Sequence, residues 1–167
     1  MNPRTKLGKT KGKENSMTSA DDTRKKVESL LRDQILGVLA THEPDQAYLS
    51  LVAFCHTSDL RRIIFASDRS TRKYANLTRN PRAAILIDNR SAAGADFRLG
   101  ITVTAFGRVH EIEDSNRSEI MRLYLEKHPR MADFVTSPST ALLYQEVEYY
   151  YVVDNSQNVT TMRMTDS

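Results

Sequence analysis

The sequence predicts a mainly β protein of the α+β class, an antiparallel barrel with flanking helices. Seven short runs rich in β-branched and aromatic residues are interspersed with only three helical patterns. Most of these runs follow one another through short polar turns, which suit antiparallel strands, since parallel strands need long crossover connections. The fifth run contains Gly107, and an interior glycine is typical of a strand that bends around a barrel.

The three helices are predicted from apolar residues at helical spacing and from residues that start or stop helices. Residues 21–34 place three apolar side chains on one face behind an acidic first turn. A second helix begins at Ser70 or Thr71 and ends before Pro81, because proline does not continue a helix. A third is predicted over residues 114–129.

The strands are predicted from period-two alternation or from short apolar runs between turn residues. They cover residues 35–41, 47–54, 61–67, 83–88, 100–112, 142–154 and 158–164. The first six are expected to form one antiparallel barrel. The fifth alternates most clearly, with Val103 and Ala105 on one side and Thr102 and Thr104 on the other.

The chain of 167 residues has the length and composition of one globular domain with a polar N-terminal extension. Residues 1–20 hold five basic residues and one acidic residue, with almost no apolar ones, so we expect a disordered basic tail. Residues 21–167 form the folded domain, which carries the other 19 basic and 20 acidic residues. The net charge of +3 therefore comes from the tail, and nucleic-acid binding is not expected to be the main function.

Several chemistries lack their usual sequence signals. The four histidines share no metal-ligand spacing, and no CxxC, HExxH, GxSxG, GxGxxG or P-loop motif occurs. Cys55 is the only cysteine, which suits a reducing cytoplasm. Because it lies beside Phe54 in a strand, we expect it to be a small buried apolar residue. No run approaches the roughly 18 apolar residues of a membrane span, and no secretory signal is visible. A cytoplasmic protein is expected.

The run SDRSTRKYANLTRNPR at residues 67–82 crowds cations and hydroxyl groups around the start of the second helix. A helix start disfavours positive charge, because the backbone dipole is itself positive there. One interpretation is a solvated basic helix. The other is a phosphate site, in which unpaired backbone N–H groups, hydroxyl groups, Arg72 and Lys73 bind an anion. The residues alone leave both open.

This region resembles the FMN-binding split barrel of the pyridoxamine 5′-phosphate oxidase-like superfamily over about residues 27–112. The resemblance rests on three strand runs, ILGVLAT, AYLSLVAF and RRIIFAS, followed by STRKYANLTRNPRAAILID. Family members end the third strand with a serine or threonine, open the helix with a triplet such as [ST]-R-K, and continue with N-L and N-P-R. Each of these features is present here, from Ser67 to Arg82.

The resemblance implies which residues would bind FMN. Thr71, Arg72 and Lys73 would hold the phosphate, with Ser67 beside them. The backbone of residues 50–52 would run along the pyrimidine edge of the flavin. The implied flavin-binding residues are Ser50, Leu51, Val52, Ser67, Thr71, Arg72, Lys73 and Thr102, the last from the long fifth strand. Homologues are dimers with the flavin in the interface, so a homodimer is implied, in which residues of the second subunit complete the site. Residues 149–151 could contribute to that site, but strand core and dimer contact are the favoured interpretation.

The function implied is that of an FMN-dependent oxidoreductase whose substrate and electron donor the sequence does not name. Vitamin B6 oxidase activity is not favoured, because the region that matches the family's second-strand arginine and lysine has Ser50 and Cys55. The family's C-terminal arginine–histidine motif has no counterpart either. The alternative is a non-catalytic flavin or haem binder with a storage or sensing role, and a deazaflavin is another ligand that the superfamily uses.

Overall fold

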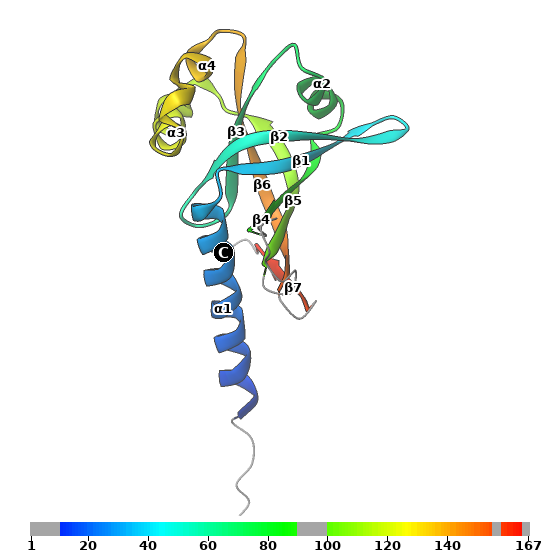
Figure 1. Cartoon of the computed structure of the whole chain (residues 1–167), viewed down its shortest axis with the longest axis vertical. Helices are drawn as coiled ribbons and strands as arrows, with labels where there is room; N and C mark the ends of the chain where they lie inside the picture. Colours follow the sequence, from blue (N-terminus) through cyan, green and yellow to red (C-terminus); the bar gives the residue numbers. More distant parts are fainter. Residues whose placement is uncertain (1–10, 90–99, 155–157, 165–167) are drawn as a thin grey trace, which may run out of the picture.

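The computed structural model of the chain describes residues 11–89, 100–154 and 158–164, and its strands form one antiparallel sheet that closes into a barrel (Figure 1). The strands of the described residues lie in the order β3-β2-β1-β4-β5-β6-β7, and β3 also pairs with β6. Six strands therefore form the barrel. β7 lies outside it and pairs only with the C-terminal part of β6. The mainly β, α+β barrel predicted from the sequence is confirmed.

The bounds of the strands lie within two residues of the predicted ones. They are β1 (Leu36–Glu43), β2 (Gln46–His56), β3 (Arg62–Asp68), β4 (Arg82–Asp88), β5 (Thr102–Glu111), β6 (Thr140–Val153) and β7 (Val159–Arg163). The pairing of β5 with β6 shifts in register between Phe106 and Gly107. A Cβ atom at Gly107 would lie 1.9 Å from the carbonyl oxygen of Glu146, so the close approach of the two strands requires glycine.

The helices agree less closely with the sequence prediction. They are α1 (Lys11–Asp33), α2 (Arg72–Arg79), α3 (Asp114–Lys127) and α4 (Ala132–Thr136), with a 3₁₀ turn at Pro129–Met131. α1 starts inside the segment for which the sequence predicts a disordered tail, and residues 1–10 of that segment lie outside the described residues. Within the described residues, no helix is both long and apolar enough to cross a membrane.

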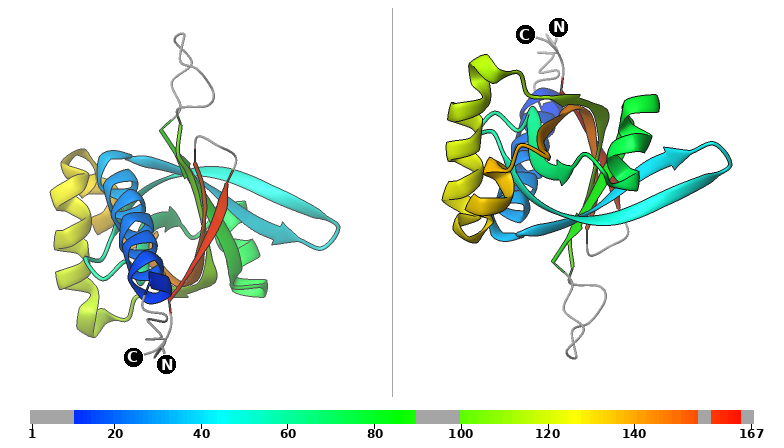
Figure 2. Two further views of the ribbon diagram at one scale, coloured as in Figure 1. Left: turned by 90° about the horizontal axis from the view of Figure 1, so that it is seen from below. Right: turned by 90° about the horizontal axis from the view of Figure 1, so that it is seen from above.

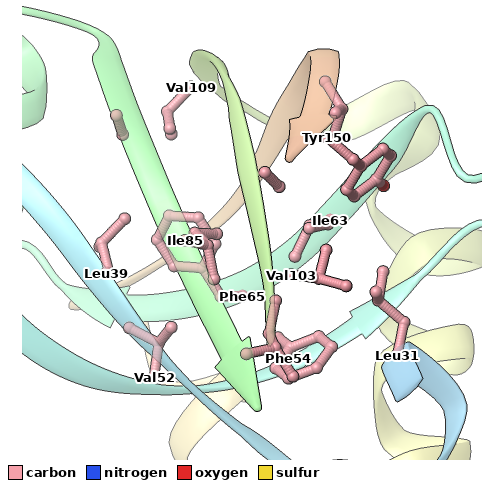
Figure 3. Packing of buried hydrophobic residues seen from close by; sticks show 14 of the residues in the cluster. Leu31, Leu39, Val52, Phe54, Ile63, Phe65, Ile85, Val103, Val109 and Tyr150 are labelled. Atoms are coloured by element: carbon pink, nitrogen blue, oxygen red, sulfur yellow. The ribbon is translucent and has the colours of Figure 1, made fainter. Parts of the chain in front are cut away.

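The barrel interior is filled by the inward-facing side chains of all six strands (Figure 3). Leu39, Phe65 and Ile85 are completely buried there. The last turns of α1 add Leu31, which is also fully buried, to the same cluster. The apolar face predicted for this helix therefore packs against the end of the barrel.

A second apolar cluster lies outside the barrel, where α3 and α4 cover β2, β3 and β6. Tyr124 of α3 and Val135 of α4 pack against Cys55 and Ile64 of the sheet. Pro129 ends α3 as predicted, but the chain then forms a 3₁₀ turn and a further short helix that the sequence did not predict.

Strand β2 separates from β3 along most of its length. Only three residues of β2 pair with β3, whereas β2 pairs with β1 along the whole hairpin. The β1–β2 hairpin projects from the barrel, and α2 lies beside it (Figure 2). The buried side chain of Asn76 in α2 donates to Thr41 Oγ1 of β1 at 3.1 Å, which ties the helix to the hairpin.

Candidate functional site

Four of the candidate residues meet where β3 ends and α2 begins. Thr71 is the N-cap of α2, and its hydroxyl accepts from the backbone N–H of Tyr74. Ser67, the buried next-to-last residue of β3, lies 2.8 Å from it, Oγ to Oγ1. Arg72 and Lys73 are the first two residues of the helix. The structure thus brings together hydroxyl groups, cations and a helix N-terminus, a combination that can bind an anion.

Asp68 already places a carboxylate in this turn. Its Oδ1 accepts from the backbone N–H and the hydroxyl of Ser70, at 2.8 and 2.6 Å, and its Oδ2 accepts from the Ser139 hydroxyl at 2.7 Å. These bonds, the one from the Ser70 hydroxyl first, lower the pKa of Asp68 from 3.8 to about 2. We did not predict this role, although an aspartate followed by a serine two residues later is a known turn signal.

Further carboxylates pair with the arginines around α2. Glu43 Oε1, at the end of β1, lies 3.4 Å from Arg72 Nε. Glu111, at the end of β5, pairs with Arg69 and accepts from the Tyr74 hydroxyl at 2.8 Å. Within the described parts of the chain, the ammonium group of Lys73 has no ion pair or hydrogen bond. Lys73 is therefore the cation available to an anionic ligand.

The candidate segment of β2 borders the start of α2. The ring of Tyr48 lies 5.6 Å from the guanidinium carbon of Arg72, and Ser50 follows two residues later on the same strand. The hydroxyl of Ser50 is buried and has no partner within the described residues. Val52 is buried, whereas the intervening Leu51 points outward and is 67% exposed. The strand thus offers its backbone and one unpaired hydroxyl group on the side of α2.

Thr102 lies far from these residues within one chain. It is the first residue of β5, whereas Glu111, which contacts the start of α2, is the last. At about 3.4 Å per residue, nine residues separate the two ends of the strand by about 30 Å. A single chain therefore does not bring Thr102 to the candidate residues at the start of α2.

The tyrosine run of β6 divides between core and surface. Tyr150 is completely buried and donates from its hydroxyl to the Leu60 carbonyl at 2.6 Å. Tyr149 and Tyr151 point outward and pack against Phe106 of β5, with ring centroids 5.0 and 5.2 Å away. The structure thus bears out the expectation of strand core for Tyr150 only.

Cys55 and the histidines form no further reactive site. Cys55 is buried, and burial raises the pKa of its thiol to about 12, so it is not activated as a nucleophile. Among residues 11–89, 100–154 and 158–164, no group of three His, Cys, Asp or Glu side chains could hold a metal ion.

Solved structures share this fold at low sequence identity. General Stress Protein 26 from Bacillus anthracis is 18% identical, with a TM-score of 0.66 over 85% of this chain and 98% of that one. An FAD-binding protein from Mesorhizobium loti is 14% identical, with a TM-score of 0.63 over 77% and 90%. A heme-binding protein from Mycobacterium smegmatis is 17% identical, with a TM-score of 0.74 over 87% of this chain and 57% of that protein.

No curated protein shows significant sequence similarity to the chain. The sequence model of the family described as pyridoxamine 5′-phosphate oxidase matches residues 23–154. The match includes the six barrel strands, α2 and α3, and so covers more than the 27–112 region on which the resemblance rested. The chain belongs to the pyridoxamine 5′-phosphate oxidase family.

Proposed function

We propose that the chain binds FMN, with the phosphate at the start of α2, and that it acts as an oxidoreductase. The observation that carries the proposal is the position of Lys73, a cation without a partner in the described residues, in the first turn of α2 beside Thr71 and Arg72. Such a turn suits a phosphate group, because N–H groups, hydroxyl groups and cations converge there. The family supports a flavin as the group that carries this phosphate.

The rest of the flavin would lie along β2. The backbone of residues 50–52 offers N–H and C=O groups to its polar edge, and the buried unpaired hydroxyl of Ser50 is a further donor there. When bound, the flavin supplies the redox chemistry. The chain would bind the phosphate, orient the ring and shape the space for a substrate. We further propose that it works in the cytoplasm, where its single cysteine would stay reduced.

A homodimer would complete the site. The outward side of the β1–β2 hairpin and its neighbours carries large apolar residues with exposed fractions of 38–67%: Leu36, Leu49, Leu51, Leu86 and Tyr151. A second copy related by a twofold axis would bury this surface. Sedimentation should then give twice the 19.0 kDa of the chain, and Leu51→Glu should shift the protein toward monomer. A wild-type monomer at micromolar concentration would contradict this part of the proposal.

The alternative is a non-catalytic flavin or haem binder, because one relative of this fold is named as a heme-binding protein. Haem iron normally takes an axial side chain, most often histidine. Among the described residues, no hydrogen bond or ion pair joins a histidine to α2; His56 and His128, for example, bond to the backbone carbonyls of Thr57 and Phe54. The cation and hydroxyl chemistry beside α2 therefore favours FMN.

The test is a visible spectrum of the purified protein, followed by titration with FMN, riboflavin and haem. Flavin bands at about 375 and 450 nm, or saturable quenching of added FMN fluorescence, would support the proposal. A Soret band with no response to FMN would favour the haem binder. Reduction of the bound flavin by NADH or NADPH, followed in the same cuvette, would separate an oxidoreductase from a flavin store.

A further inference from the structure

The start of α2 is a basic segment whose charges are largely balanced by carboxylates from elsewhere in the fold. Arg69 pairs with Glu111 of β5, and Arg72 pairs with Glu43 of β1. The charge of Asp68 lies in the turn itself. A phosphate that arrives here meets three negative charges of the protein as well as the cations that attract it.

Glu43 is the best placed of the three to act on a ligand. It lines a groove between the β1–β2 hairpin and α2, together with Pro44, Ser70, Thr71, Arg72, Asn76 and Arg79. The groove thus includes the N-cap and the first residue of the helix, where the phosphate is proposed to bind. Glu111 and Asp68 have strong bonds to other groups, to Tyr74 and Arg69 in one case and to Ser70 and Ser139 in the other.

The Glu43 carboxylate is held in place before any ligand arrives. Its side chain is only 17% exposed, and Gln46 Nε2 donates to its Oε2 at 3.1 Å. The bond from Gln46, with the charge of Arg72, outweighs the opposing effect of burial and keeps the pKa of Glu43 below its usual value, so it is ionised at neutral pH. Its partner is more open to solvent, because the Arg72 side chain is 62% exposed.

Arg72 is therefore shared between two anions once a phosphate binds. Its Nε faces Glu43, and within the described residues its other N–H groups make no hydrogen bond or ion pair. The ionised Glu43 carboxylate repels a phosphate dianion that binds beside it. The same carboxylate also neutralises part of the charge of Arg72, so Arg72 attracts the phosphate less strongly. Both effects lower the affinity for phosphate without touching the ring of a flavin.

We propose that Glu43 sets the affinity of the flavin site for phosphate, so that FMN is held as an exchangeable ligand. This inference rests on the proposed function. The residue acts through Arg72 and through its own charge, and it is a specificity-determining residue for the phosphate end of the ligand. It reduces the advantage of FMN over riboflavin and speeds the release of FMN.

The experiment compares Glu43→Gln with the wild type, using FMN and riboflavin as probes in a fluorescence titration. Glutamine keeps the shape of the side chain and an oxygen that accepts from Arg72, and it removes the charge. Its amide nitrogen replaces the oxygen that accepts from Gln46, whose own amide can turn to accept from it. We expect FMN to bind about three- to tenfold more tightly and to dissociate more slowly. Riboflavin, which lacks the phosphate, should bind as it does to the wild type.

The matched control is Asp45→Asn at the tip of the same hairpin. Asp45 is exposed and has no ion pair in the described residues. The substitution removes the same charge as Glu43→Gln, at a position two residues further along the chain. Its FMN affinity should change less than about twofold, because an exposed charge at this distance is screened.

The outcomes separate this inference from the function on which it rests. A wild type that binds neither flavin overturns the proposed function, and with it the role of Glu43. A wild type that binds FMN but gains nothing from Glu43→Gln overturns the role of Glu43 alone. Equal gains for FMN and riboflavin, or from Asp45→Asn, also overturn it. If Glu43→Gln lowers the melting temperature, the comparison is repeated with Glu43→Ala, at a temperature at which this variant and the wild type are both folded.

Discussion

Lys73 is the residue whose loss should most reduce FMN affinity. Its ammonium group has no partner in the described residues, so no existing ion pair offsets the loss when it is replaced by alanine. A charge-assisted contact to phosphate is worth about 1.5–3 kcal/mol, so Lys73→Ala should weaken FMN binding about ten- to a hundredfold. Arg72→Ala should also weaken it, by an amount toward the lower end of this range, because Glu43 already holds part of its charge.

Arg79 provides a graded control on the same helix, because it lines the same groove as Glu43 but comes from the last turn of α2. It lies seven residues beyond Arg72, which is about 10 Å along the helix axis at 1.5 Å per residue. At that distance in water, with one Debye length of screening, its attraction for a dianion is about 0.3 kcal/mol. Arg79→Ala should therefore reduce FMN affinity less than about twofold.

The assay is fluorescence titration of each variant with FMN and with riboflavin. Riboflavin affinity should be nearly the same in all three variants, since it has no phosphate to lose. The stability of the ligand-free Lys73→Ala protein should not fall, because a cation at a helix start is unfavourable. Equal losses for FMN and riboflavin, or equal losses from Lys73→Ala and Arg79→Ala, would refute the phosphate site and leave a solvated basic helix.

Three further predictions concern stability, measured by urea unfolding. Tyr150→Phe removes the donor to the buried Leu60 carbonyl and should cost about 1–3 kcal/mol; a loss below about 0.5 kcal/mol would contradict a buried bond. Gly107→Ala puts a methyl group 1.9 Å from the Glu146 carbonyl oxygen and should cost more than about 3 kcal/mol, so a variant of wild-type stability would disprove this close approach. Asp68→Asn should be less stable than the wild type at pH 7. Because the folded pKa of Asp68 is lowered from 3.8 to about 2, its contribution is present above 3.8 and is lost as the pH falls toward 2, where the two proteins should converge; a difference that does not depend on pH would argue against this origin.

The fold could be predicted because its signals are local. Alternation and turn residues predict the ends of each strand to within two residues. Gly107 marks the place where the pairing of β5 with β6 shifts in register. Two helical features were missed. Pro129 predicts the end of a helix, but proline also suits the first position of a helical turn, as in the turn at Pro129–Met131. The start of α1 at Lys11 lies in a segment with no apolar face, the signal on which the prediction depended.

The candidate site could be predicted only where it is contiguous in sequence. Ser67, Thr71, Arg72 and Lys73 lie within seven residues, so one turn and one helix start bring them together. The carboxylates that balance these cations come from other strands, and Glu111 follows Arg69 by 42 residues. No local pattern relates such residues, because the closure of the barrel is what places them side by side.

The position of Thr102 limits how much of the flavin site one chain can form. It shares β5 with Glu111, which contacts α2, yet the two residues lie at opposite ends of a strand about 30 Å long. A strand in a closed barrel cannot fold back, so no motion within one chain brings Thr102 to Lys73. If one flavin contacts both residues, they must belong to different copies of the chain. The homodimer that we propose, built on the outward face that includes Leu51, is the arrangement in which the family's implied role for Thr102 and the phosphate site at α2 are compatible.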